Sequence, residues 1–330
     1  MKYSKAEAKD YAKEKLVGIF SAFCVPDTPD GEIDEAGLRR DIRYYIDVIR
    51  VGGLYVHGFY GNFWLLTTDE RKRVMEIVAD EARGAVPIVC RCAHQSMKET
   101  IGLIQHAEAH GADFISLIGP AFGSASESMI FEYFEHVADS TNLGLSIFNT
   151  AQAGYVIRPE VMARLATIPN VAALKNAVDM AHTIRVRELA GDQIVVVDPS
   201  EENFLISLLQ FGQKAIYTGT NYMSDSARAT PMRDYAHAAL AGEAAKAVKL
   251  YYQMQPLRDL HTKWVRTPWD QDRLCPVATI KHWTQQLGLT GGTTRPPLQQ
   301  ISPEAAAHLR AEMEGVGLVG TQEPATVTAA

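Results

Sequence analysis

The stretch Val171-Ala172-Ala173-Leu174-Lys175-Asn176 places a lysine at the end of an apolar run. If this run is a buried strand, the amine at its inner end lies in surroundings of low dielectric, which disfavour the charged form and lower its pKa. A neutral amine can attack a ketone and form an imine, which turns the bound substrate into an electron sink. The alternative is a surface lysine at the point where a strand meets its loop.

Short apolar runs recur on both sides of this stretch, separated by amphipathic segments. Together with it they predict eight strands, at 17–24, 54–56, 86–90, 114–118, 143–148, 171–174, 194–197 and 215–217. Strands that alternate with helices form a parallel sheet, and eight such units close into a barrel. The sequence therefore predicts an α/β protein with a (β/α)8 TIM barrel. A doubly wound open sheet is the alternative, but its Gly-x-Gly-x-x-Gly turn is absent after the first run.

The segments between these runs carry apolar residues at helical spacing. They predict helices at 34–51, 96–110, 126–138, 159–166 and 202–209, with Pro159 in the first turn of its helix. Another helix is expected to have Thr68 as its N-cap, because Asp69 and Glu70 place acids in the first turn.

The pattern divides the chain into three parts. The barrel is expected to occupy residues 1–240, with a short N-terminal segment before the first strand. Residues 241–316 carry no strand signal and predict a C-terminal helical extension packed on the barrel, with helices at 244–257, 276–287 and 303–313. Residues 317–330 are expected to form a frayed tail.

The composition indicates a soluble protein with a sizeable core. The 330 residues are 47% hydrophobic and carry a formal net charge of −7, with acidic and basic residues interspersed. This balance argues against a nucleic-acid or membrane partner. No run approaches a membrane span and no signal-peptide pattern is present, so a cytoplasmic location is expected. The four cysteines lack the spacing of a zinc knuckle or a redox pair.

Active sites of (β/α)8 barrels form at the C-terminal ends of the strands, so residues at these positions are candidates. They are His57, Phe59, Tyr60, His94, Phe122, Phe148, Asn149, Lys175, Asn176, Asp198, Tyr217 and Asn221.

Four of these segments resemble the dihydrodipicolinate synthase / N-acetylneuraminate lyase superfamily of class I aldolases, over roughly residues 15 to 315. They are Gly18-Ile19-Phe20-Ser21-Ala22-Phe23 with Pro26, Gly58-Phe59-Tyr60-Gly61-Asn62, Phe148-Asn149 and Ala173-Leu174-Lys175-Asn176-Ala177. The resemblance implies a homo-oligomer, tetramer or dimer, in which Lys175 forms the imine and the loop at Gly58 holds the substrate carboxylate. A lysine imine needs no external cofactor, and no metal is expected.

The chain departs from the family's pattern at positions that normally carry hydroxyl groups. Phe148 replaces the strand-five tyrosine that relays protons to and from the imine intermediate, and Phe122 aligns with a second relay tyrosine. Phe59 and Tyr60 align with two threonines of the carboxylate loop. A phenyl ring neither donates nor accepts a proton, so the usual relay cannot operate here.

Proton transfer must then come from water or from a substitute such as Tyr60, His57 or Tyr217. His57 and His94 are equally well explained as hydrogen-bonded structural histidines. The arginine that binds a second carboxylate in dihydrodipicolinate synthase is absent from Thr150-Ala151-Gln152-Ala153-Gly154. A role in lysine biosynthesis is therefore not expected.

The predicted function is that of a Schiff-base-forming lyase, an aldolase or hydratase-aldolase, acting on a 2-oxo acid with an aromatic or hydrophobic substituent. Catalysis is assigned to Lys175, Tyr60 and His57, and substrate binding to Gly58, Phe59, Tyr60, Phe122, Phe148, Asn149, Tyr217 and Asn221. Phe63 and Trp64 either back the pocket or fill the core. Two alternatives remain: an imine-dependent dehydratase or decarboxylase, and a non-catalytic 2-oxo-acid-binding or regulatory member of the family.

His106 and His110 lie four residues apart on a predicted helix, which places both imidazoles on one face, as some zinc sites require. No third ligand is identifiable in the sequence, and the helix is expected on the exterior of the barrel. A metal site is therefore not expected there.

Overall fold

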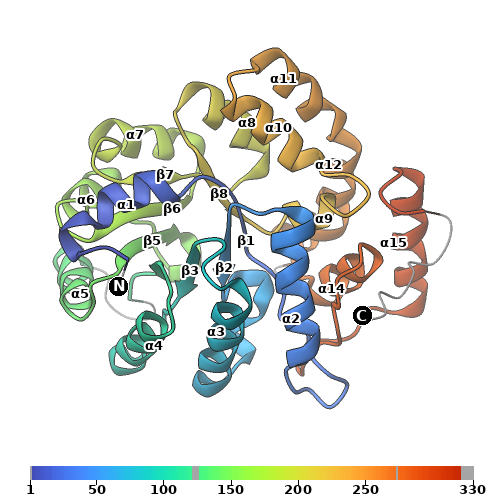
Figure 1. Ribbon diagram of the computed structural model, residues 1–330, viewed down its shortest axis with the longest axis horizontal. Helices are drawn as coiled ribbons and strands as arrows, with labels where there is room; N and C mark the ends of the chain where they lie inside the picture. Colours follow the sequence, from blue (N-terminus) through green and yellow to red (C-terminus); the bar gives the residue numbers. More distant parts are fainter. Residues whose placement is uncertain (1, 121–125, 273, 321–330) are drawn as a thin grey trace.

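A barrel of parallel strands forms the centre of the computed structural model, which describes residues 2–120, 126–272 and 274–320 (Figure 1). In these residues the sheet has eight strands: β1 (Gly18–Ser21), β2 (Gly53–Val56), β3 (Ile88–Arg91), β4 (Phe114–Leu117), β5 (Gly144–Thr150), β6 (Val171–Ala177), β7 (Val195–Val197) and β8 (Ala215–Thr218). Their order is β7-β6-β5-β4-β3-β2-β1-β8. Each strand overlaps one of the predicted runs, and the (β/α)8 barrel is confirmed.

The barrel closes where β7 and β8, the two ends of the strand order, come into contact. The buried side-chain amide of Gln213 bridges this seam. Its Oε1 accepts a hydrogen bond from the N–H of Asp198 at 2.9 Å, and its Nε2 donates to the carbonyl groups of Asp198 and Ala215, each at 2.9 Å. One side chain thus satisfies backbone groups that would otherwise be buried without partners.

Helices surround the strands and continue beyond β8 (Figure 1). They are α1 (Ala8–Lys15), α2 (Glu35–Arg43), α3 (Thr68–Ala82), α4 (Met97–Ala109), α5 (Glu127–Asp139), α6 (Pro159–Leu165), α7 (Met180–Ala190), α8 (Glu201–Gln210), α9 (Asn221–Ser224), α10 (Pro231–Leu240), α11 (Ala244–Gln253), α12 (Gln255–His261), α13 (Thr267–Asp272), α14 (Val277–Gln286) and α15 (Pro303–Gly315). Among the described residues, none of these helices combines the length and apolar character needed to span a bilayer.

Two predicted helix boundaries were wrong. The N-cap of α3 is Thr67, not Thr68: its hydroxyl accepts from the N–H of Glu70, and its own N–H donates to the Glu70 carboxylate, which completes a capping box. The single helix expected at 244–257 is two helices, α11 and α12, because Pro256 cannot continue α11 and instead lies in the first turn of α12.

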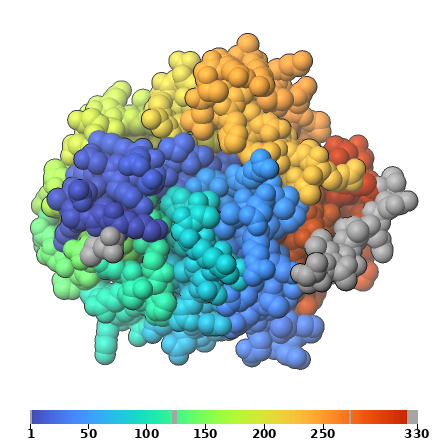
Figure 2. Space-filling model, in the orientation of Figure 1, coloured from blue at the N-terminus to red at the C-terminus, as the bar shows by residue number. Residues whose placement is uncertain are grey.

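The segment before β1 covers the N-terminal ends of the central strands, where it is blue in Figures 1 and 2. Helix α1 contacts β5, β6 and β7. Tyr3 donates a hydrogen bond to the carbonyl of Asp113, just before β4, and accepts one from the N–H of Gly144 at 2.7 Å. This segment covers one end of the barrel, and the candidate residues lie at the other end.

The helices after β8 are attached to the barrel by buried polar contacts. Lys281 of α14 is 1% exposed and donates to the carboxylate of Asp27, which follows β1, at 2.6 Å. Arg295 binds the other oxygen of Asp27 at 2.9 Å. Among the helices after β8, Trp283 of α14 donates from its indole N–H to the carbonyl of Met223 in α9 at 2.8 Å. Of the tail expected at 317–330, residues 321–330 lie outside the described residues.

Candidate active site

Lys175 and Phe148 are direct partners in the pairing of β6 with β5. Side chains of paired residues project to the same face of a sheet, and here that face is the barrel interior. The Nζ of Lys175 lies 4.4 Å from the ring centroid of Phe148 and 4.7 Å from that of Tyr55, a residue of β2. The amine therefore lies against two aromatic rings, near the C-terminal end of β6.

The environment of Lys175 disfavours a positive charge. The residue is 8% exposed, and burial, followed by the nearby charge of Arg91, lowers the pKa of its amine to about 7. No acidic group in the described part of the chain forms an ion pair with Nζ. A large fraction of the amine is therefore neutral near pH 7, as nucleophilic attack requires.

Arg91, which the sequence analysis missed, is the second buried cation of the interior. It ends β3, is 4% exposed, and places its Cζ 3.9 Å from the ring centroid of Phe63 and 5.5 Å from that of Phe148. Its Nε and Nη1 have no hydrogen-bond partner among the described residues, and burial lowers its pKa to about 10. The signal was present in the sequence, since Ile88-Val89-Cys90-Arg91 repeats the pattern of a cation after an apolar run.

A cavity of about 520 Å³ opens at the C-terminal ends of the strands. Its barrel side is lined by Ala22, Phe59, Tyr60, Phe148, Thr150, Lys175, Ala177, Tyr217, Thr218 and Gly219. The lysine that the sequence singled out thus faces a space large enough for a small organic acid.

One wall of this cavity is aromatic. The ring of Phe59, in the short 3-10 helix η3 (Phe59–Gly61), lies edge-to-face with Trp269 of α13, with centroids 4.5 Å apart. Trp64 packs on Phe59 at 4.7 Å but is 38% exposed and is not part of the lining. Trp269 was missed because it follows the barrel in sequence, far from any strand end.

The wall formed by α8 and the helices after β8 is polar. It includes Glu202, His261, Arg266 and Asp270. The Nε2 of His261 is buried without a hydrogen-bond partner in the described ranges, and burial lowers the pKa of its imidazole to about 4. His261 is therefore neutral near pH 7. Arg266 and Asp270 form an ion pair at 3.6 Å.

Of the predicted site residues that the structure describes, five come together in this cavity and the others do not. Those in the lining are Phe59, Tyr60, Phe148, Lys175 and Tyr217. The lining excludes His57, Gly58, Asn149 and Asn221, whereas Phe122 lies outside the described residues.

Asn149 and Asn221 have other partners. Asn149 follows Phe148 in β5, so its side chain points to the opposite face of the sheet. There it accepts from the N–H of Ile157 at 2.9 Å and donates to the Ile157 carbonyl at 3.0 Å. Asn221 donates to the hydroxyl of Ser21 at 2.6 Å. The structure gives both residues structural contacts in place of the expected substrate contact.

His57 is turned away from the cavity. It has a left-handed backbone conformation, with φ of 60°, which ends the side-chain alternation of β2. Its Nε2 forms a 2.9 Å hydrogen bond with the carbonyl of Arg71, and burial holds its pKa well below the usual value. The structural interpretation of His57 fits this position better than the predicted catalytic one. His94, in the loop between β3 and α4, is exposed and likewise absent from the lining.

Tyr60 and Tyr217 are the phenols that line the cavity. Burial raises the pKa of both hydroxyls, so both remain protonated near pH 7 and can donate a hydrogen bond. The ring of Tyr60 lies against Gly219, where a Cβ would come within 2.3 Å of Tyr60 Cδ2. The ring of Tyr60 therefore fits in the cavity wall because residue 219 has no side chain.

Comparison with known proteins agrees with this geometry. The model of the dihydrodipicolinate synthetase family matches residues 15–315. A 4-hydroxy-tetrahydrodipicolinate synthase from Methanothrix thermoacetophila is 31% identical over 89% of this chain and 94% of its own, and an N-acetylneuraminate lyase from Clostridium perfringens is 30% identical over 88% and 96%. The fold matches the crystal structure of YagE, a prophage protein of the dihydrodipicolinic acid synthase family from E. coli K12 in complex with pyruvate. The TM-score is 0.78, with 24% identity over 92% of this chain and 99% of that one.

Proposed function

Because the chain belongs to the dihydrodipicolinate synthetase family, we propose that it is a lyase in which Lys175 forms an imine with a 2-oxo acid. The observation that carries this proposal is a buried amine, with its pKa lowered to about 7, in the lining of a 520 Å³ cavity. Pyruvate is the natural first probe, since the E. coli relative was crystallised with it.

The chemistry follows from the neutral amine. Nζ attacks the keto carbon, a carbon–nitrogen bond forms, and water leaves to give a protonated imine. When the bond between the adjacent carbon and the hydroxyl-bearing carbon beyond it breaks, its electron pair moves into the imine and gives an enamine. The hydroxyl group loses its proton to a base, and that fragment leaves as an aldehyde. A proton then returns to the adjacent carbon, and hydrolysis releases the product and regenerates the amine of Lys175.

The substrate carboxylate is assigned to the backbone N–H groups at Phe59 and Tyr60. The side chains of both residues line the cavity in place of the threonines of the family loop. Backbone donors do not depend on the side chain, so the replacement leaves them in place.

The aromatic wall supports a substrate with an aryl or hydrophobic substituent. Phe59 and Trp269 offer two ring surfaces in the cavity that Lys175 lines, while Glu202, Arg266 and Asp270 on the other wall offer partners for a polar end. Proton transfer to the enamine is assigned to the phenol of Tyr60 or Tyr217, because Phe148 has no hydroxyl group.

Reductive trapping tests the proposal. The protein is incubated with pyruvate and borohydride, and the modified residue is located by peptide mass spectrometry. We expect the reduced adduct on Lys175, its loss in Lys175→Ala, and its retention in the surface variant Lys98→Ala. An unmodified Lys175, or equal modification of Lys175→Ala, would overturn the assignment.

Phenylalanine stands at positions 59, 122 and 148, where the family pattern has a hydroxyl group. The loss of these three hydroxyl groups favours a second candidate, a member of the family that binds 2-oxo acids without turnover. Deuterium exchange at the methyl group of pyruvate in D2O separates the two candidates, because exchange requires repeated passage between imine and enamine. Trapping with exchange supports the lyase, and trapping without exchange supports the binding protein. A homo-oligomeric, cytoplasmic protein remains our prediction for the state in the cell.

A further inference from the structure

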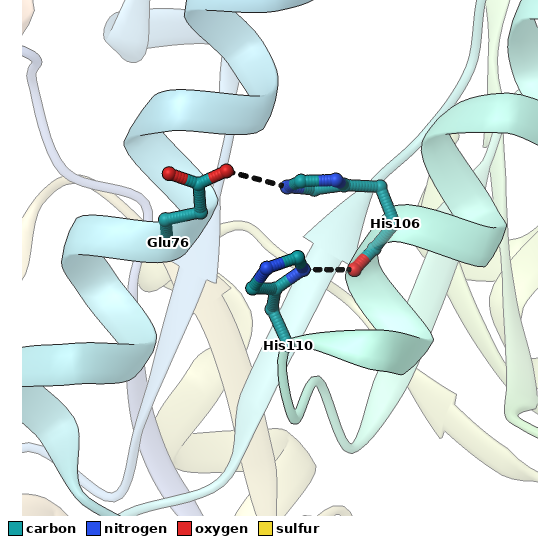
Figure 3. A group of neighbouring side chains, drawn as sticks. All are labelled: Glu76, His106 and His110. Atoms are coloured by element: carbon teal, nitrogen blue, oxygen red, sulfur yellow. Dashed lines mark hydrogen bonds and ion pairs between the residues drawn. The ribbon is translucent and has the colours of Figure 1, made fainter.

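The two histidines that the sequence placed on one helix face have a third neighbour in the fold. His106 of α4 and His110, the C-cap of that helix, stack with ring centroids 4.0 Å apart, and Glu76 of the adjacent helix α3 faces them (Figure 3). One ligand atom from each of the three residues lies within 4.8 Å of the other two. Sequence spacing could not identify Glu76 as a third ligand, because Glu76 lies near the histidines only through the packing of α3 against α4.

The orientation of the three side chains leaves ligand atoms free. The Nδ1 of His110 forms a 2.8 Å hydrogen bond with the carbonyl of His106, which makes Nδ1 the protonated nitrogen and leaves a lone pair on Nε2. The Nε2 of His106 lies 3.2 Å from Glu76 Oε1 but is buried without an aligned hydrogen bond in the described structure. Arg73 holds Glu76 through its other oxygen at 3.0 Å.

Two cations lie near the cluster. Arg73 donates to Glu76 at 3.0 Å, and the charge of Lys72 acts on His106, so both oppose binding of a cation and limit the expected affinity.

We propose that Glu76, His106 and His110 form a binding site for a divalent transition metal ion, with Zn²⁺ as the ion best suited to two imidazoles and one carboxylate. Three protein ligands leave the fourth tetrahedral position to water. The three ligand atoms lie within 4.8 Å of one another, wider than in a closed zinc site, and approach by rotation of the half-buried Glu76 and His106 and the exposed His110. Because the ligands come from two helices on the outside of the barrel, the ion joins α3 to α4 and is independent of the imine chemistry at Lys175.

Metal titration of the full chain tests this site. After removal of metal with EDTA, calorimetric titration with Zn²⁺ should show one site per chain and a raised melting temperature. His110→Ala and Glu76→Gln should each weaken Zn²⁺ binding by about tenfold or more, and should abolish the rise in melting temperature. Co²⁺ in place of Zn²⁺ should give the intense visible absorption of a tetrahedral site.

The chain offers a matched control in His308, which pairs with Glu312 across one turn of α15 at 3.1 Å but lacks a second imidazole among the described residues. His308→Ala should leave Zn²⁺ binding unchanged. Absence of binding to the parent chain, or equal affinity in the parent, His110→Ala and Glu76→Gln, would overturn the proposal. Equal loss in His308→Ala would do the same, since it would indicate non-specific surface binding.

Discussion

Lys175 and Arg91 share one aromatic neighbour: the Nζ of Lys175 and the Cζ of Arg91 lie 4.4 Å and 5.5 Å from the ring centroid of Phe148. The two cations come from β6 and β3 and are both buried. Neither forms an ion pair with a carboxylate in the described part of the chain. Each disfavours the charge of the other, and Lys175 can respond by losing its proton whereas Arg91 cannot.

The first prediction concerns the pH dependence of imine formation. Because the pKa of Lys175 is lowered to about 7, the fraction of neutral amine rises through pH 7 and is nearly complete about two pH units higher. The initial rate of reductive trapping with pyruvate should follow this curve. A midpoint near the ordinary lysine value would contradict the environment described for this residue.

The second prediction concerns Arg91. Arg91→Met removes a positive charge near the amine, so protonated Lys175 becomes less unfavourable and its pKa rises. We expect the midpoint of the trapping curve to move to higher pH by about 1 unit. Arg91→Lys keeps the charge and should leave the midpoint close to that of the parent. If the folded Arg91→Met protein has an unshifted midpoint, burial alone controls the amine.

The third prediction concerns the missing relay. Phe148→Tyr places a hydroxyl group on the ring that contacts Lys175 Nζ. General acid–base groups contribute roughly 10²–10⁴-fold to proton transfer, so deuterium exchange at the methyl of pyruvate should accelerate by at least about tenfold. Phe63→Tyr, on a ring that lies 3.9 Å from the Cζ of Arg91, is the control and should not accelerate exchange. Equal rates in Phe148→Tyr and the parent would mean that another group already supplies the proton.

The fourth prediction concerns substrate selection by the aromatic wall. Trp269→Ala removes the ring that lies 4.5 Å from Phe59. An aromatic pair contributes about 0.5–1.5 kcal/mol beyond its buried area, so half-saturation of trapping by phenylpyruvate should rise up to about tenfold. Pyruvate should be unaffected. Trp64→Ala, which also contacts Phe59 but lies outside the lining, is the matched control. An equal effect on both acids would point to a general disturbance of the loop.

The fifth prediction concerns the seam between β7 and β8. Gln213→Ala leaves the N–H and carbonyl of Asp198 and the carbonyl of Ala215 without the partner described above. Each buried polar group that loses its partner costs about 1–3 kcal/mol, and three groups are affected, so the free energy of unfolding should fall by at least about 3 kcal/mol. Denaturant unfolding measures this, with the exposed Gln210→Ala as control. A loss equal to that of Gln210→Ala would show that water replaces the amide.

The strands were predictable because both of their faces are buried, so each strand gives an uninterrupted apolar run in the sequence. Helix ends were less predictable where two signals compete. Thr67 and Thr68 are both capable N-caps, and the choice depends on which of them has Glu three residues later. The break at Pro256 was readable from the proline itself, whereas α10 was not predicted although Pro231 begins it.

The direction of a side chain in the site was predictable where the strand pattern fixes it. Lys175 and Phe148 follow from strand position, since partners in the sheet face the same way. Assigning both Phe148 and Asn149 to one pocket was inconsistent with the two-residue period of a strand. Trp269 and His261 reach the cavity from the helices after the barrel, and no local pattern in the sequence connects these helices to a strand end.

Arg266, Trp269 and Asp270 bring a part of the chain that follows the barrel into the cavity that Lys175 lines. A chain shortened after β8 would keep Lys175, Phe148 and Arg91, the residues that make the amine a weak base, but would lack these three wall residues. The barrel thus supplies the reactive nitrogen, and the helices that follow it shape the space in which an acid binds.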